Sequence, residues 1–110
     1  MLVYIEEAHP TGEWQPPSNL AEDVRINQHS SLEERQAAAQ SYANDHKTEI
    51  PIAVDGMENT ANHFFAAWPV RIYIIDAKGK VYFQGGRGPY DFKIDEARAS
   101  LEELLEAGGA

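Results

Sequence analysis

The sequence predicts an α/β layered domain with the element order β-α-β-α-β-β-α. Two nearly continuous apolar runs, over residues 2–6 and 71–76, are typical of strands that are buried on both faces. Strand patterns also alternate with helical patterns along the chain, which favours a layered arrangement. With 110 residues, of which 43% are hydrophobic and 25% charged, the chain has the size and composition of one soluble domain spanning 1–110.

The first half of the chain predicts a strand over 2–6 and a long loop over 10–28, which is rich in proline and other breakers. Ser31-Leu-Glu-Glu34 is a capping box, in which the serine oxygen and the glutamate carboxylate satisfy free amides at a helix start. The helix should run from 31 to about 46. Its apolar face should hold Leu32, Ala39, Tyr42 and Ala43.

A short strand is expected next, over 51–54, followed by a short helix over 57–67. The aromatic side chains in and after this helix should face the core: Phe64, Phe65 and Trp68. The segments 71–76 and 80–84 then predict a hairpin, because Gly79 can supply the positive φ of a tight turn.

Asp95 is expected to cap the last helix, which should extend to about residue 106. The core stripe of this helix should consist of Ile94, Ala97, Leu101 and Leu104. A hairpin followed by a helix is also how a thioredoxin-like fold ends. On that comparison the chain lacks the first strand and helix of the fold, and the sequence is interpreted as N-terminally truncated.

The charge balance excludes one class of partner. Nine Lys and Arg stand against eighteen Asp and Glu, a net charge of −9, so nucleic acid and anionic membranes would be repelled. No apolar run approaches the roughly 20 residues that cross a bilayer. We therefore expect no membrane segment in this chain and a cytoplasmic location by default, while an upstream N-terminal membrane anchor stays possible. The sequence has no cysteine, so it carries no thiolate nucleophile.

Tyr4, Glu7 and His9 form the first candidate constellation. Glu7 and His9 are two residues apart, so a strand would point them to one side at its carboxyl end, where ligands of open α/β sheets bind. A carboxylate beside an imidazole can tune proton transfer. The alternative is an exposed Glu7 and a His9 that only caps the loop. His29 precedes the capping box, where the helix N-terminus disfavours its protonation. The spacing of these groups selects no metal, and none is predicted.

Two arginines form the second constellation. Arg87 lies in Gly85-Gly-Arg-Gly-Pro89, between a strand and a helix, where backbone amides can hold an anion and the guanidinium can pair with a carboxylate. Arg71 either points into the same cleft as Arg87, or its side chain pairs with one of the many acidic residues of the chain. The alternative is a flexible connection that carries one solvated arginine.

Five blocks, in order along the chain, resemble the iodothyronine deiodinases. They are Tyr4-Ile-Glu-Glu-Ala-His-Pro10 with Gly12 and Trp14, Gln28-His-Ser-Ser-Leu-Glu-Glu-Arg35, Val54-Asp-Gly-Met57 with Asn59, Arg71-Ile-Tyr-Ile-Ile75, and Gln84-Gly-Gly-Arg-Gly-Pro89. The resemblance implies a thioredoxin-like, peroxiredoxin-related domain in which a selenocysteine or cysteine upstream of Tyr4 removes iodine from an iodothyronine or similar halogenated phenol. It implies no cofactor beyond a thiol reductant as co-substrate.

The resemblance also implies roles for single residues. Tyr4 and Glu7 match proton-relay positions, and His9 matches a histidine that contacts the phenol. His29 matches a second histidine of the cleft, and Arg87 matches an arginine that clamps the substrate's carboxylate. With Arg71, these residues are the expected catalytic and substrate-binding set.

The chain departs from the family pattern near the clamp. Val70 replaces an acidic residue and Trp68-Pro69 replaces an aromatic pair, with a cis bond expected before the proline. Without its nucleophile, this chain alone is expected to be inactive. Strand edges left open by the missing strand should lead to a homo-oligomer. Two alternatives are a relative of the peroxiredoxin-like thiol peroxidases and a non-catalytic binding or scaffold remnant.

Overall fold

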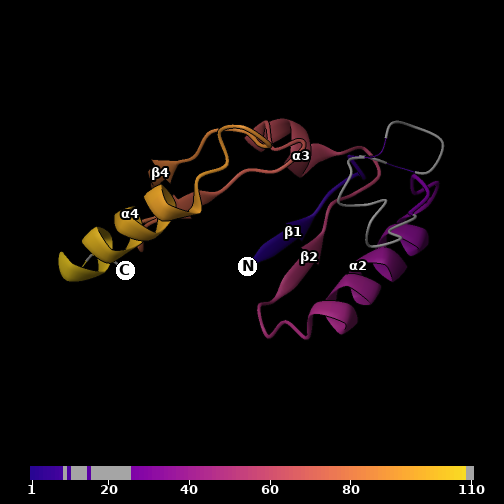
Figure 1. The fold of residues 1–110 in the computed structure, drawn as a ribbon, viewed down its shortest axis with the longest axis horizontal. Coiled ribbons are helices and arrows are strands. Elements are labelled where there is room, and N and C mark those ends of the chain that lie inside the picture. The colour runs from indigo at the N-terminus through magenta and orange to yellow at the C-terminus, as the bar shows by residue number, and fades with distance from the viewer. Residues whose placement is uncertain (9, 11–14, 16–25, 109–110) are drawn as a thin grey trace. The chain divides into compact units, whose positions relative to one another are not determined.

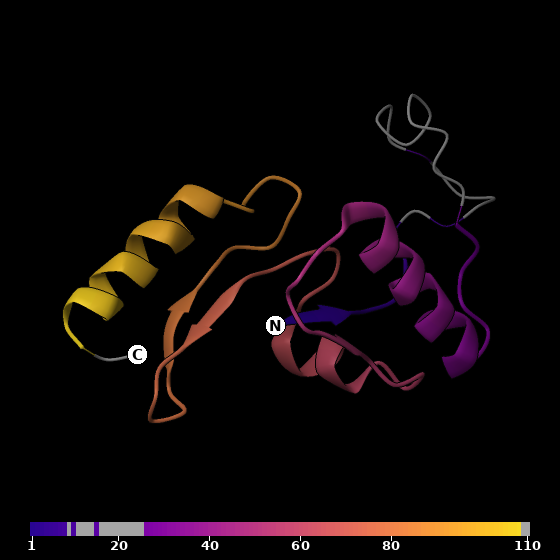
Figure 2. The same ribbon diagram turned by 90° about the horizontal axis from the view of Figure 1, so that it is seen from below.

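The computed structural model describes residues 1–8, 10, 15 and 26–108. Its elements follow the predicted order and confirm the α/β class (Figures 1 and 2): β1 (Leu2–Tyr4), α2 (Leu32–His46), β2 (Ile52–Val54), α3 (Thr60–Phe65), β3 (Tyr73–Ile75), β4 (Val81–Gln84) and α4 (Ile94–Glu106). The chain divides into two compact units, Met1–Phe65 and Ala66–Ala110. The single domain over 1–110 stays a prediction. In the described ranges, no helix is long and apolar enough to cross a membrane.

The first unit is a β-α-β arrangement. β1 and β2 pair in parallel, with Leu2 opposite Ile52, and α2 makes the crossover between them and packs against β2 (Figure 2). The buried residues of α2 are Arg35 and Ala39. The predicted apolar face is therefore right for Ala39 but wrong for Leu32 and Tyr42, which are 43% and 38% exposed. A guanidinium takes the inner position because backbone carbonyls at the end of β2 accept its hydrogen bonds.

The capping box at the start of α2 is confirmed, with one difference. Ser31 is the N-cap, and its Oγ accepts a hydrogen bond from the amide of Glu34 at 3.2 Å. The Glu34 carboxylate reaches back one residue further than predicted and accepts from the amide of Ser30 at 2.6 Å. This bond draws residues 29 and 30 against the helix start. It thereby helps to place His29 beside the first turn.

The second unit consists of a hairpin and a helix. β3 and β4 pair antiparallel, with Tyr73 opposite Gln84, and α4 packs against both strands. Gly79 has a φ of +80°, as the predicted turn requires. Asp76 closes the turn, since its Oδ1 accepts from the amides of Lys78 and Lys80, both at 2.9 Å. The predicted hairpin is confirmed.

Two predictions about α4 need correction. Its N-cap is Lys93, which makes no side-chain capping bond, and Asp95 lies inside the first turn. There its negative charge favours the helix through the helix dipole rather than through a capping hydrogen bond. Of the predicted core stripe, Ala97 and Leu104 are buried, whereas Ile94 and Leu101 are exposed.

The prediction that the apolar strands are buried on both faces is wrong. Leu2 and Val3 are 37% and 40% exposed, and Ile75 is 52% exposed. Among the described residues the strands form two separate two-stranded sheets, so each central apolar run has a neighbouring strand on one side only. Phe64 is also exposed, at 81%, and meets Phe65 edge-on instead of facing the core.

Candidate functional site

Tyr4 and Glu7 meet where β1 ends. The Tyr4 hydroxyl donates a hydrogen bond to Oε1 of Glu7. The strand ends at Tyr4, so the predicted alternation of side chains does not extend to Glu7. Instead the backbone of Glu7 is held by the side-chain amide of Gln28, which accepts from its N–H and donates to its carbonyl, both at 3.1 Å. His9 lies outside the described residues.

His29 lies against the same carboxylate. Its Nε2 is 3.7 Å from Oε1 of Glu7, and its ring centroid is 5.7 Å from that of Tyr4. The residue is buried, and Nε2 has no hydrogen-bond partner within the described part of the chain. On the other side of the ring, Nε of Arg35 donates to Nδ1 at 3.1 Å. Three predicted site residues, Tyr4, Glu7 and His29, are therefore brought together.

Burial controls the protonation of this cluster. Burial, and then the hydrogen bond to Glu7, raises the pKa of the Tyr4 hydroxyl far above its usual value. Burial also lowers the pKa of His29, an effect that Arg35 reinforces and the negative charge of Glu7 opposes. The sequence predicted this direction for His29 but attributed it to the helix N-terminus. The raised pKa keeps the Tyr4 hydroxyl protonated as the donor to Glu7, and the lowered pKa favours the neutral imidazole of His29.

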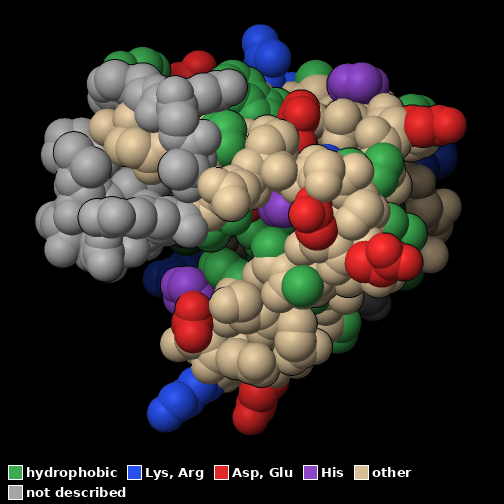
Figure 3. Space-filling model, turned by 90° about the vertical axis from the view of Figure 1, so that its right-hand side faces the viewer, with side chains coloured by type: hydrophobic (Ala, Val, Ile, Leu, Met, Phe, Trp, Pro, Cys, Tyr) green, Lys and Arg blue, Asp and Glu red, His purple; other side chains and the backbone are tan. Residues whose placement is uncertain are grey.

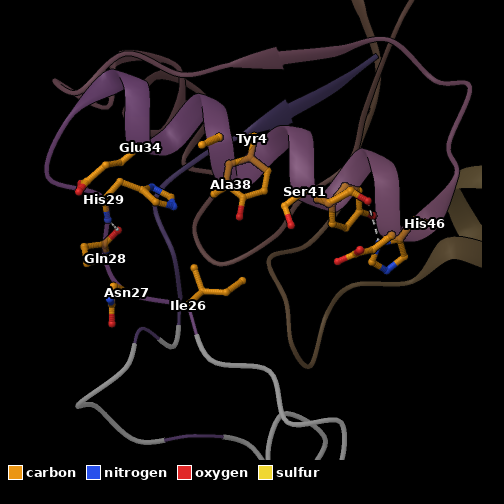
Figure 4. A pocket seen from close by; sticks show the side chains of 12 residues that line it. Tyr4, Ile26, Asn27, Gln28, His29, Glu34, Ala38, Ser41 and His46 are labelled. Atoms are coloured by element: carbon orange, nitrogen blue, oxygen red, sulfur yellow. Dashed lines mark hydrogen bonds between the residues drawn. The ribbon is translucent and has the colours of Figure 1, made fainter.

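A pocket of about 490 Å³ opens beside the cluster. In Figure 4, Tyr4 and His29 lie along it with Ser41 and Ala38 of α2, and Ile26 lies across from the helix. Figure 3 shows hydrophobic side chains in a hollow of this face, close to histidine side chains. A volume of this size suits a small aromatic ligand, and the largely apolar lining suits its ring.

Sequence reasoning missed two residues of this site, Gln28 and Arg35. Both lie in the block 28–35, but neither was assigned a role. A signal for Arg35 existed, because it lies four residues before Ala39 and so on the buried face of the helix. An arginine at such a position needs buried acceptors. Gln28 gave no comparable signal, since its contacts are with residue 7, far away in the sequence.

The second unit contains a separate pocket of about 520 Å³, lined by Trp68, Pro69, Arg71, Arg87, Gly88 and Asp91. The two predicted arginines thus share one pocket. Arg71 is fixed by the backbone, since its Nε donates to the Gly85 carbonyl at 2.7 Å and its Nη1 to that of Ala66 at 3.3 Å. Arg87 is exposed. The predicted cis bond at Trp68–Pro69 is confirmed, and Gly88–Pro89 is cis as well.

A cleft shared by His9, His29 and Arg87 stays a prediction. His9 is not described, and Arg87 belongs to the second unit. Within the described residues, no group of three or more His, Cys, Asp or Glu side chains is arranged to hold a metal ion.

Comparison with known proteins gives a consistent picture. A family model described as iodothyronine deiodinase matches residues 1–105. The chain is 41% identical to the thyroxine 5-deiodinase of Gallus gallus over 113 aligned positions, covering 100% of this chain and 42% of the relative. It is 35% identical to the type I iodothyronine deiodinase of Xenopus laevis, covering 94% of this chain and 38% of the relative.

The thyroxine 5-deiodinase of Bos taurus is 36% identical over 96% of this chain and 34% of its own length. The chain therefore spans about two fifths of the length of the curated relatives that it matches. The match over nearly the whole chain, together with the predicted motif blocks, leads to one conclusion: this chain belongs to the iodothyronine deiodinase family.

Proposed function

We propose that this chain is the proton-relay and substrate-binding part of a reductive deiodinase that acts on an iodothyronine or a similar iodinated phenol. One observation carries the proposal. The Tyr4 hydroxyl and the buried His29 imidazole both lie against the Glu7 carboxylate, and Tyr4 and His29 line a pocket. Family membership supplies the reaction class, and this cluster supplies groups that can move protons.

In the proposed reaction an aryl–iodine bond is replaced by an aryl–hydrogen bond and iodide leaves. The two electrons come from a selenol or thiol nucleophile, which a thiol co-substrate then regenerates as its own sulfur is oxidised to a disulfide. The ring gains one proton, and the thiols release theirs. The sequence holds no cysteine, so the nucleophile lies outside these residues in our proposal.

The residues of this chain would handle the protons and hold the substrate. Glu7 can accept a proton and pass it on, because it already accepts a hydrogen bond from Tyr4. The pocket beside Tyr4 would take an iodinated ring, whose apolar and polarisable surface suits its lining. Arg87 would pair with a carboxylate, since its guanidinium is exposed in a pocket of its own unit.

We further propose that the intact protein has a thioredoxin-like, peroxiredoxin-related sandwich. The observed order β-α-β-α-β-β-α, with a parallel first pair and a terminal hairpin followed by a helix, supports that arrangement. Among the described residues β1 is paired along one edge only, and this supports a homo-oligomer formed by strand pairing.

A chimera tests the function. The matching segment of the Gallus gallus relative would be replaced by this chain, and iodide release from thyroxine would be measured with dithiothreitol as reductant. We expect the chimera to release iodide and the chain alone to release none above a buffer blank. In the chimera, Glu7→Gln should lower the rate about 100-fold or more, the usual range for loss of a general acid–base group.

Glu49→Gln is the matched control, because Glu49 is exposed and lies outside the cluster. A folded chimera without iodide release would refute the proposal, as would a Glu7→Gln chimera with an undiminished rate. Iodide release by the chain alone that disappears on Arg87→Ala would refute the placement of the nucleophile. Peroxide consumption without deiodination would favour the thiol peroxidase alternative.

A further inference from the structure

Arg35 is held in one position from two sides. It is 2% exposed, and its Nη1 donates to the carbonyls of Asp55 at 3.3 Å and Gly56 at 2.9 Å and to Oδ1 of Asn59 at 3.0 Å. These acceptors belong to the end of β2 and the loop that leads to α3. A guanidinium is planar and rigid, so anchoring Nη1 also fixes the direction of the Nε–H bond. That bond points at Nδ1 of His29.

This contact determines where the imidazole proton resides. A guanidinium has only N–H donors and stays protonated in proteins. Nδ1 of His29 must therefore present its lone pair to Arg35, at the observed 3.1 Å. In a neutral imidazole the single proton is then on Nε2. Protonating Nδ1 as well would set an N–H against an N–H and place a second positive charge beside the guanidinium.

The other ring nitrogen faces the relay. Nε2 lies 3.7 Å from Oε1 of Glu7, the same oxygen that accepts the Tyr4 hydroxyl, and it has no hydrogen-bond partner within the described residues. A buried donor without a partner is costly, by about 1–3 kcal/mol. A small approach of Glu7, or a ligand in the adjacent pocket, would satisfy it. The Nε2–H donor is thus aimed at the carboxylate.

We propose that Arg35 is a positioning residue that holds His29 as a neutral Nε2–H donor, so that Glu7 and not the histidine carries the exchanging proton of the relay. The use of this arrangement in catalysis rests on the proposed function. The tautomer itself is a property of this chain and can be tested without any activity. In this arrangement His29 stays a neutral hydrogen-bond donor, whereas a histidine acting as a general base would take up a proton.

The charged and titratable groups around His29 come from two sides. Tyr4 and Glu7 belong to β1 and the residues after it, and Glu34 and Arg35 belong to α2. The two glutamates favour a charged imidazole, whereas burial and Arg35 disfavour it, and the balance lowers the pKa of His29. Because Arg35 also donates to Nδ1, its loss should allow either ring nitrogen of His29 to carry the proton. The loss should also raise the pKa of His29.

The test is long-range ¹H–¹⁵N NMR of the histidine rings in the full 110-residue chain, titrated from neutral to acidic pH. The His29 signals are identified by their absence in a His29→Gln variant. We expect a protonated Nε2 and an unprotonated Nδ1 at neutral pH, with a titration midpoint below the ordinary value of about 6.5. An Nδ1–H tautomer, or an imidazolium at neutral pH, would overturn the proposal on the wild-type chain alone.

Arg35→Lys then keeps the positive charge and removes the planar guanidinium. The single ammonium group of the lysine cannot donate both to the carbonyls of Asp55 and Gly56 and to the imidazole of His29. We expect mixed His29 tautomers and a higher midpoint. Asn59→Gly is the control. It removes one acceptor of Nη1 and leaves Nε–H in place, and glycine accepts the φ of +58° found at Asn59. Unchanged His29 signals in Arg35→Lys would refute the positioning role, and so would an equal change in Asn59→Gly.

Discussion

Gly88 lies directly against Val70. The amide of Gly88 donates to the carbonyl of Val70 at 2.9 Å, and a Cβ atom added at Gly88 would overlap Cγ1 of the valine. A glycine is therefore needed at position 88 for close backbone approach, not for an unusual φ. Val70, one of the departures expected from the family resemblance, thus packs against the loop that carries Arg87.

We predict that Gly88→Ala destabilises the second unit by about 1–3 kcal/mol, the usual range for overpacking. The added methyl group must displace Val70 or the loop, and either shift moves the neighbouring Arg87. The measurement is the urea midpoint of unfolding. Gly56→Ala is the control, because nothing lies within 4 Å of a Cβ at Gly56. Equal midpoints for the two variants would show that the Gly88 contact is unimportant.

Asp55 holds the start of α3. Its Oδ1 accepts from the amide of Ala61 at 3.0 Å and its Oδ2 from that of Asn62 at 2.9 Å. Asp55→Ala should cost about 0.5–2 kcal/mol, as removal of a helix cap does. Chemical denaturation followed by circular dichroism measures the cost. Asp45→Ala is a matched change at an exposed position of α2 and should stay within about 0.5 kcal/mol of wild type.

Local signals in the sequence predicted local structure well. The Ser31 cap and the turn at Gly79 were correct because each depends on residues a few positions apart. Tyr4 and Glu7 were also predicted to belong to one site, and they meet, although the strand was predicted to end too late. The contacts of Arg35 could not be found this way. They join α2 to a loop more than twenty residues later, and no periodicity encodes that meeting.

Core burial was the least predictable property. The apolar runs of β1 and β3 resemble strands with neighbours on both sides, yet each has one neighbour within its described sheet. Periodicity reports which residues could be buried, but the number of strands that pack around them is a property of the assembled sheet. For the same reason the exposure of Phe64 could not be deduced from its aromatic character.

The alkaline titration of Tyr4 provides a pH-dependent test. Its pKa is raised in the folded chain, so its contribution to stability is present below the ordinary value of about 10 and is lost as the pH rises above it. Ultraviolet difference titration should show a late-ionising tyrosine that Tyr4→Phe removes. The urea midpoint of this variant should depend less on pH above about 10 than that of wild type.

Tyr82 is the necessary comparison, because its hydrogen bond with Glu103 also raises its pKa. Tyr82→Phe should remove a different, more exposed component of the titration. If Tyr4→Phe leaves the late component unchanged while Tyr82→Phe abolishes it, the half-buried hydrogen bond between Tyr4 and Glu7 is not maintained in solution.

Within the part of the chain that the structure describes, β1 is paired along one edge only, which predicts self-association. The Leu2 amide and the Tyr4 carbonyl bond toward β2, so the strand turns the amide and carbonyl of Val3 to the opposite edge. Leu2 and Val3 are also exposed apolar side chains. An unpaired edge beside apolar side chains is a template for pairing. We expect the β1 edges of two chains to pair, giving a dimer in light scattering whose fraction rises with protein concentration.

Val3→Pro tests this pairing, because it removes the outward amide without touching the ladder between β1 and β2. The variant should be monomeric, and the drop in molar mass should occur without unfolding. Val3→Thr retains the amide and a strand-favouring side chain, so it should still dimerise. A wild-type monomer that unfolds cooperatively would contradict the prediction, since it would mean that the edge is already satisfied within one chain. A Val3→Pro dimer would place the interface elsewhere.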